Sequence, residues 1–67
     1  MSVARVTEIS ATSPKSFEDA VKTGIKRANQ TLRNVKAAWI KEQQVKVTDG
    51  KATEYQVNML VTFVLDE

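Results

Sequence analysis

The sequence predicts an α+β domain with the element order β-α-β-β, in which one helix packs across one face of a three-stranded antiparallel sheet. Three observations lead to this fold. β-Branched residues are enriched in residues 3–10, apolar residues then recur every three or four positions, and two later runs alternate on either side of Asp49-Gly50. The first and last patterns are typical of strands, and the second is typical of an amphipathic helix.

The first strand is expected over residues 3–10, followed by a turn over residues 11–15 that contains the single proline. Ser16 resembles a helix N-cap, because its side chain can accept a hydrogen bond from the first turn. Glu18 and Asp19 follow where the positive end of a helix dipole favours acidic residues. We therefore expect the helix to start near Ser16.

The helix is expected to end near Asn34. Its apolar residues are spaced by three and four, so they form one stripe that faces the core. This stripe consists of Phe17, Ala20, Val21, Gly24, Ile25, Ala28, Leu32 and Val35. A glycine inside a helix costs about 1 kcal/mol relative to alanine. Close packing of Gly24 against a strand would explain that cost.

Residues 35–48 and 51–65 are expected to form two long antiparallel strands joined by a two-residue turn at Asp49-Gly50. If the pairing continues without slip, paired residue numbers sum to 99, and Ile40 lies opposite Met59 on the helix-packed face. The other face then carries apolar residues together with polar ones. The apolar set is Val35, Ala37, Trp39, Leu60 and Val64, and the polar set is Lys41, Gln43, Gln56, Asn58 and Thr62.

The small size of the chain predicts association with other copies. A single domain of 67 residues buries only about 60% of the surface that its unfolded chain exposes. The sequence contains no cysteine for disulfides and no histidine for a typical zinc site. Of the features that usually stabilise so small a domain, oligomerisation is the one that remains. Val35, Trp39, Leu60 and Val64 are the expected interface residues.

The charge balance argues against a nucleic-acid partner. Ten Lys and Arg face eight Asp and Glu, a net charge of +2. Lys22, Lys26, Arg27 and Arg33 are interpreted as a solvated helix surface, because no aromatic residues are interleaved with them for base stacking. No apolar run approaches membrane-spanning length, and no secretory signal is recognised. We expect a cytoplasmic protein without a membrane partner.

The whole chain, residues 1–67, resembles the dodecins as a single domain. The resemblance rests on the order and spacing of several short motifs rather than on any one of them. These are Thr12-Ser13-Pro14, Ser16-Phe17-Glu18-Asp19-Ala20, Arg27-Ala28, Tyr55-Gln56-Val57 and Val61-Thr62-Phe63-Val64-Leu65. The resemblance implies a hollow homododecamer with helices outside and sheets facing inward, which agrees with the association expected from size.

The resemblance also implies a small-molecule ligand. Many dodecins store or sequester flavins such as riboflavin, FMN or FAD, bound in pairs near a two-fold axis. A tryptophan on the strand after the helix stacks on the ring, and a glutamine on the last strand bonds its polar edge. Gln56 matches that glutamine. A gap-free alignment places Ala37 at the tryptophan position and Gln44 at the position of a flavin-binding arginine.

Trp39 lies two residues beyond the position of the family tryptophan, which keeps the same face but moves the ring by about 7 Å. Some dodecin-like proteins lack the flavin tryptophan and are associated with calcium, and residues 35–43 are similar to that branch. Trp39 is therefore interpreted first as an inter-subunit packing residue and second as a flavin-stacking residue. Gln56 has two readings of equal weight, as a ligand contact and as a buried subunit contact.

Calcium is the alternative ligand class. Glu8, Glu42 and Asp49 offer carboxylate oxygens, but they lack the spacing of a dedicated calcium loop, so any metal site would have to be assembled by symmetry. No pair of side chains has a spacing that suggests catalysis, and we expect no enzyme. The favoured hypothesis is a flavin-binding homododecamer, and the alternative is a flavin-free shell with a structural or calcium-binding role.

Overall fold

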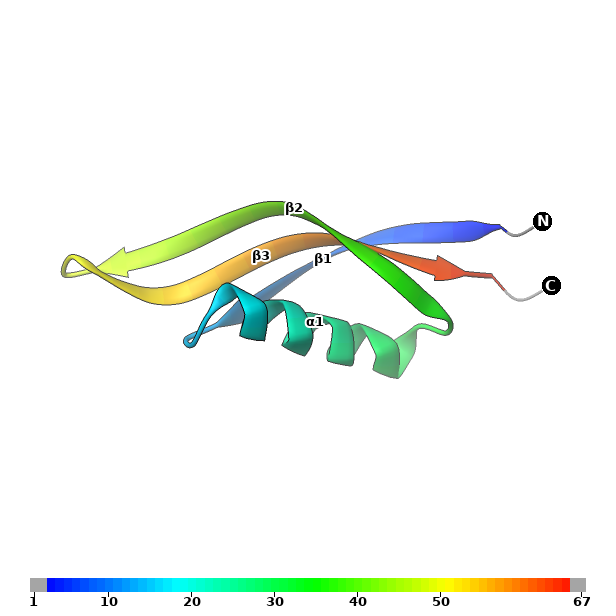
Figure 1. Ribbon diagram of the computed structural model, residues 1–67, viewed down its shortest axis with the longest axis horizontal. Helices are drawn as coiled ribbons and strands as arrows, with labels where there is room; N and C mark the ends of the chain where they lie inside the picture. Colours follow the sequence, from blue (N-terminus) through cyan, green and yellow to red (C-terminus); the bar gives the residue numbers. More distant parts are fainter. Residues whose placement is uncertain (1–2, 66–67) are drawn as a thin grey trace.

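The computed structural model describes residues 3–65, and within them it confirms the expected fold (Figure 1). The elements are β1 (Ala4–Ser13), α1 (Phe17–Thr31), β2 (Val35–Thr48) and β3 (Lys51–Val64). The strand order in the sheet is β1-β3-β2, with both outer strands antiparallel to β3. α1 connects the two outer strands and packs on one face of the sheet. Among the described residues, no helix is long and apolar enough to cross a membrane.

β1 extends three residues beyond its predicted end. Ala11 and Ser13 lie opposite Val57 and Tyr55 of β3, so the segment expected to be a turn continues the strand. Ser13 is 3% exposed and is held at the corner by two hydrogen bonds. Its Oγ donates to Asp19 Oδ2 (2.6 Å) and accepts from the backbone N–H of Lys15 (3.0 Å). The turn is therefore confined to the residues just before the helix.

The predicted N-cap is confirmed, whereas the predicted end of the helix is wrong. Ser16 has an extended backbone, and its Oγ accepts from the backbone N–H of Asp19 at 3.0 Å. α1 ends at Thr31 because Leu32 is already extended (φ −109°, ψ 142°) and Asn34 has a positive φ of 59°. Leu32 still packs against the core, which is why the apolar spacing continues past the helix.

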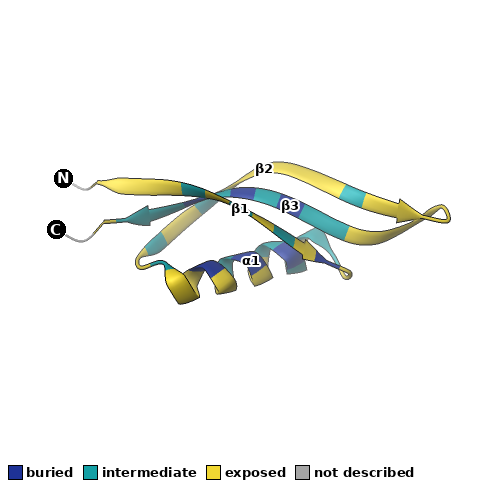
Figure 2. Cartoon of the chain, turned by 180° about the vertical axis from the view of Figure 1, so that it is seen from behind, coloured by how far each residue is buried: buried dark blue, intermediate teal, exposed yellow. Residues whose placement is uncertain are grey.

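The core is small and lies between α1 and the middle of β3 (Figure 2). Ala20, Val57, Met59 and Val61 are fully buried. The ring of Phe17 packs edge-to-face on Tyr55, with 5.1 Å between ring centroids. Such a small core supports the expectation that further burial comes from other chains.

Gly24 marks the closest approach of α1 to the sheet. A Cβ atom at this position would lie 2.6 Å from Met59 Cε and 2.9 Å from Ala11 Cβ. Both distances are shorter than van der Waals contact allows. The cost of a glycine in the helix is therefore explained by the close packing that it permits.

The turn of the β2–β3 hairpin has the expected form, but the expected unbroken pairing is wrong. Asp49 and Gly50 both have positive φ (53° and 75°), as a type I′ turn requires. The pairing shifts at three places, each with one extra residue: Thr53 on β3, and Lys41 and Lys36 on β2. The shifts at Thr53 and Lys41 lie on opposite strands and cancel each other. Residues 37–40 therefore keep their predicted partners.

Candidate functional site

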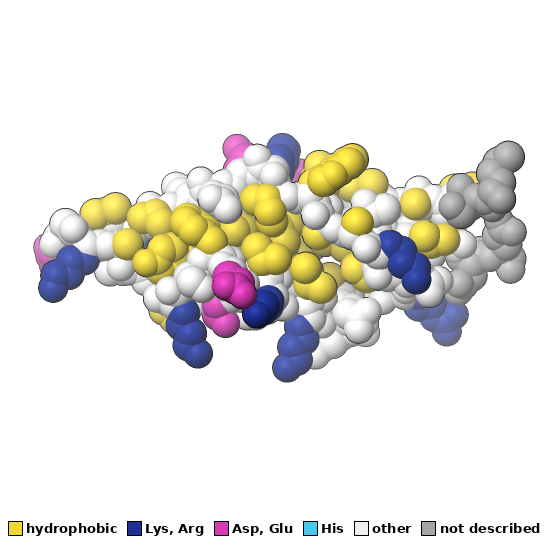
Figure 3. All heavy atoms as spheres, in the orientation of Figure 1, with side chains coloured by type: hydrophobic (Ala, Val, Ile, Leu, Met, Phe, Trp, Pro, Cys, Tyr) yellow, Lys and Arg dark blue, Asp and Glu magenta, His cyan; other side chains and the backbone are white. Residues whose placement is uncertain are grey.

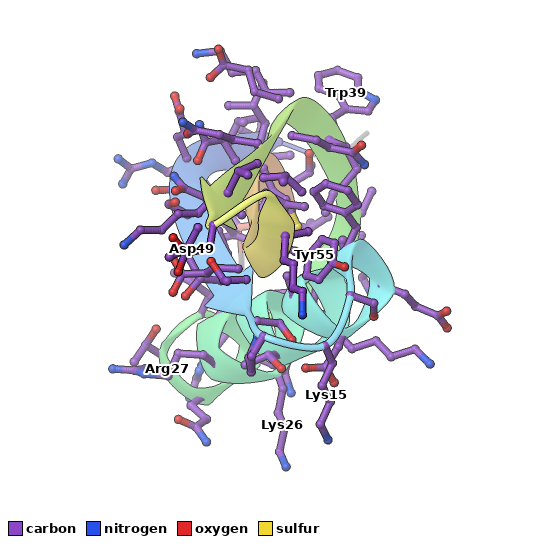
Figure 4. All side chains as sticks on the ribbon, turned by 90° about the vertical axis from the view of Figure 1, so that its left-hand side faces the viewer. Lys15, Lys26, Arg27, Trp39, Asp49 and Tyr55 are labelled. Atoms are coloured by element: carbon purple, nitrogen blue, oxygen red, sulfur yellow. The ribbon has the colours of Figure 1, made fainter. Side chains whose placement is uncertain are left out.

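The sheet face turned away from α1, called the open face below, carries Trp39. On β3, buried Val57, Met59 and Val61 point towards the core, so the alternating residues point the other way. Trp39 lies opposite Leu60 and therefore shares the open face. Its side chain is 68% exposed, and Figure 4 shows it on the opposite side of the sheet from α1.

Ala37 and Val64 also lie on the open face, as predicted. Ala37 is opposite Thr62, two residues from Leu60 on the same side of β3. Val64 is opposite Ala4 of β1 and is half-buried. The open face thus contains the expected position of the family tryptophan, occupied here by alanine, with Trp39 beside it.

Two residues predicted for this face are displaced by the shifts in pairing. Val35 was expected opposite Val64, but it lies opposite Phe63 and packs against the core. The extra residue Lys36 reverses the side to which Val35 points. Gln43 was expected opposite Gln56, but it lies opposite Val57 and so points to the helix side. The placement of Val35 at an interface on the open face is therefore wrong.

The structure brings Gln44 and Gln56 together. They lie opposite each other on β2 and β3, because the extra residue Thr53 moves Gln44 into the place expected for Gln43. Both side chains thus share the open face with Trp39. Gln56 is four residues from Leu60, the partner of Trp39, which corresponds to about 13 Å along the strand. An aromatic ring and a pair of amides therefore occupy one stripe of the sheet.

The extra residue at Lys41 places two consecutive side chains on the open face. Lys41 Nζ lies 3.3 Å from Glu8 Oε1 of β1, in an ion pair that is half-exposed on both sides. Glu42 Oε1 accepts from Asn58 Nδ2 of β3 at 3.0 Å. Strand periodicity alone does not place Glu42 on this face, because strict alternation assigns consecutive residues to opposite sides.

Gln56 extends this set of hydrogen bonds, because it contacts Asn58 as well as β1. Its Nε2 donates to Ser10 Oγ (3.0 Å) and to Asn58 Oδ1 (3.3 Å). We call Ser10, Gln56, Asn58 and Glu42 the amide row. Ser10 was not among the predicted site residues, because no pairing was predicted for the first strand; in the structure it lies opposite Asn58.

Apolar side chains lie beside the amide row on the open face. Trp39 and Leu60 are joined there by Val6 of β1, which lies opposite Thr62 and is 51% exposed. Figure 3, which views the molecule from the side with α1 below the sheet, shows hydrophobic side chains exposed along most of its length. Exposed apolar surface beside polar groups is typical of an interaction or ligand surface.

The three carboxylates considered for calcium are not gathered in one chain. Glu8 and Glu42 share the open face through their contacts to Lys41 and Asn58, but Asp49 lies in the hairpin turn. Within residues 3–65, no group of three or more His, Cys, Asp or Glu side chains is placed to hold a metal ion. A calcium site built on the carboxylates of residues 3–65 would therefore need ligands from another chain or oxygen ligands of other types.

The helix surface has the character of a solvated face. Lys22 and Glu18 form an ion pair (2.9 Å) in which both side chains are about three-quarters exposed. The hydrogen bond that Lys22 donates to Glu18, together with the negative charge of Glu18, raises the pKa of Lys22. Lys26 points away from the sheet, and Arg27 extends to the side of α1 (Figure 4). A groove of about 520 Å³ opens between α1 and β1, but Trp39, Gln44 and Gln56 do not line it.

Comparison with known proteins agrees with the sequence motifs. Residues 3–66 match the sequence profile of the Dodecin family. A dodecin from Streptomyces davaonensis is 41% identical, with a TM-score of 0.93 over 98% of this chain and 97% of that chain. A mutant of the dodecin from Thermus thermophilus is 31% identical, with a TM-score of 0.94 over the full length of both chains.

A third relative is named for a metal. The calcium dodecin of Mycobacterium tuberculosis is 32% identical over 63 residues, which cover 94% of this chain and 89% of that protein. The structure of that protein is described as a calcium-chelating antigen with a novel calcium-binding site. It superposes on this chain with a TM-score of 0.82 and 28% sequence identity, and the match covers 96% of this chain and 91% of that one. Family, fold and the order of motifs agree along nearly the whole sequence, and the chain belongs to the dodecin family.

Proposed function

We propose that the protein is a ligand-storage protein rather than an enzyme, and that it binds a flat aromatic molecule, flavin being the leading class, on the open face. The observation that carries this proposal is Trp39, a large ring that is 68% exposed on a sheet face which also presents Gln44 and Gln56. Stacking needs an accessible ring, and the polar edge of a flavin needs hydrogen-bonding side chains beside it.

The binding form is a homododecamer of the dodecin type, with helices outside and open faces inside. The monomer buries few side chains fully and leaves Trp39 and Val6 in water. Burying a large aromatic such as Trp39 removes roughly 150–250 Å² from water, worth several kcal/mol at about 25 cal/mol per Å². Association therefore covers the open face and encloses the ligand.

The position of Trp39 suits a ligand that lies further along the strands, towards Gln44 and Gln56, than a ligand stacked on residue 37 would. Ala37 lies six residues along β3 from the level of Gln56, whereas Trp39 lies four residues from it. The ring is thus about 7 Å closer to the amide pair than a tryptophan at position 37 would be. A ring stacked on Trp39 can lie over Ala37 or extend towards Gln44 and Gln56.

A flavin titration tests this function. Riboflavin and FMN are added to the native protein while flavin and tryptophan emission are followed, and stacking is expected to quench both. Because Trp39 is the single tryptophan of the chain, its emission reports on this site alone. Trp39→Ala is expected to weaken riboflavin binding by about 10-fold or more, and Trp39→Phe by less, because phenylalanine keeps an aromatic face.

The control for this titration is Phe17→Leu, which alters an aromatic residue on the helix side of the sheet. It is expected to leave riboflavin affinity unchanged. Unaltered emission of both fluorophores at high micromolar flavin would contradict the flavin proposal.

Calcium is the second candidate, favoured by the similarity to a calcium dodecin and by the two carboxylates on the open face. A ligand that binds only the folded state raises the melting temperature in a concentration-dependent way. Calcium, but not the same concentration of magnesium, is then expected to raise the melting temperature of the wild type. Glu8→Gln and Glu42→Gln are expected to reduce the increase. No calcium-specific increase would rule this candidate out.

A further inference from the structure

The amide row forms a directed chain of hydrogen bonds across all three strands. Asn58 Nδ2 donates to Glu42 Oε1 at 3.0 Å, and Gln56 Nε2 donates to Asn58 Oδ1 at 3.3 Å. The same Gln56 Nε2 donates to Ser10 Oγ at 3.0 Å. Ser10 lies on β1, Gln56 and Asn58 on β3, and Glu42 on β2.

Glu42 determines which side-chain atoms donate and which accept along this series of hydrogen bonds. An ionised carboxylate accepts hydrogen bonds but donates none, so Asn58 has to turn its amide nitrogen towards Glu42. The carbonyl oxygen of Asn58 is then left facing Gln56. Gln56 must in turn present its amide nitrogen, because the opposite rotamer would place two carbonyl oxygens against each other.

Both amide hydrogens of Gln56 are used by this arrangement. One points to Asn58 Oδ1 and the other to Ser10 Oγ. The group of Gln56 that remains for a ligand is its carbonyl oxygen Oε1, which is an acceptor. A glutamine without these partners would offer a ligand both a donor and an acceptor.

We propose that Glu42, acting through Asn58, is a positioning residue that makes Gln56 a hydrogen-bond acceptor towards the ligand. The open face therefore selects flat aromatic rings that carry an N–H donor at their edge. In a flavin this donor is the ring N3–H. The inference rests on the proposed function of the open face and deepens it by naming the ligand group that Gln56 recognises.

The charges of the open face favour the same class of ligand. Lys41 is already paired with Glu8, so the carboxylate of Glu42 is not neutralised by that ammonium group. A ligand edge that carries a partial positive charge, as an N–H does, is attracted there, and an anionic edge is repelled. Exclusion of water in an assembled shell would strengthen both effects.

The test compares riboflavin with N3-methylriboflavin, in which a methyl group replaces the donor hydrogen. Affinities for the native protein are measured by flavin fluorescence. The wild type is expected to bind riboflavin about 10-fold more tightly, because a net hydrogen bond of about 1.4 kcal/mol corresponds to that ratio. Glu42→Leu removes the acceptor that orients Asn58 and is expected to reduce the ratio at least about threefold.

Glu42→Gln is the intermediate variant, because its amide can accept from Asn58 Nδ2 but can also donate to Asn58 Oδ1, and its ratio is expected to lie between those of the wild type and Glu42→Leu. Any steric effect of the methyl group is common to all three proteins and cancels when their ratios are compared. Equal ratios in the wild type, Glu42→Gln and Glu42→Leu would overturn this inference alone. No riboflavin binding by the wild type would overturn the proposed function and this inference with it.

Discussion

Gly24→Val is expected to lower the free energy of unfolding by roughly 3 kcal/mol or more, enough to unfold much of a small domain. The first carbon of any side chain at this position would meet Met59 Cε at 2.6 Å and Ala11 Cβ at 2.9 Å. Valine adds two methyl groups to a Cβ atom that already overlaps both neighbours. Urea unfolding at a fixed protein concentration measures the change as a shift in midpoint.

Gly24→Ala separates the two opposing effects at this position. Alanine favours the helix by about 1 kcal/mol, whereas overpacking costs about 1–3 kcal/mol. We expect a small net loss of stability for Gly24→Ala. Lys26→Val introduces valine at an exposed position of the same helix and is the control, with a loss below about 1 kcal/mol. A stability of Gly24→Val equal to that of Lys26→Val would contradict the packing of α1.

Leu60→Asp is expected to dissociate the native particle. Leu60 lies opposite Trp39 in the middle of the apolar part of the open face. An unpaired carboxylate in a dry interface costs several kcal/mol and is repeated in every subunit of a symmetric assembly. Light scattering is expected to show a fall from about 90 kDa, for twelve chains of 7.5 kDa, to single chains or small oligomers.

The matched control is Asn29→Asp, which makes the same change in net charge on the exposed surface of α1. This surface is expected to lie outside the assembly, so the native mass is expected to stay unchanged. Dissociation by both variants would point to a general effect of the added carboxylate rather than to the open face. An unaltered mass for Leu60→Asp would show that the open face is not the interface.

The element order was predictable because each element has its own apolar period. The N-cap at Ser16 and the turn at Asp49-Gly50 were also predictable, since each has residues suited to its backbone. The end of the helix was not predictable from spacing. Leu32 and Val35 pack against the same core from extended backbone and so continue the helical stripe.

The open face was predictable in outline but not in every residue. Trp39 and Leu60 were placed correctly because the shifts in pairing at Lys41 and Thr53 cancel. The shift at Thr53 is accompanied by a hydrogen bond from its hydroxyl to the Lys46 carbonyl (3.2 Å), a side-chain contact that strand periodicity does not reveal. The same shift moved Gln44 to a position opposite Gln56, where Gln43 had been expected.

Quenching of Trp39 fluorescence by acrylamide tests most directly whether the open face is covered in the native protein. In a single chain the side chain of Trp39 is 68% exposed, and the chain contains no second tryptophan. If copies of the chain cover the open face, quenching in the native protein should be several-fold weaker than for free tryptophan. Leu60→Asp should restore efficient quenching. Quenching of the wild type as efficient as that of free tryptophan would contradict the assembly and the enclosed ligand site together.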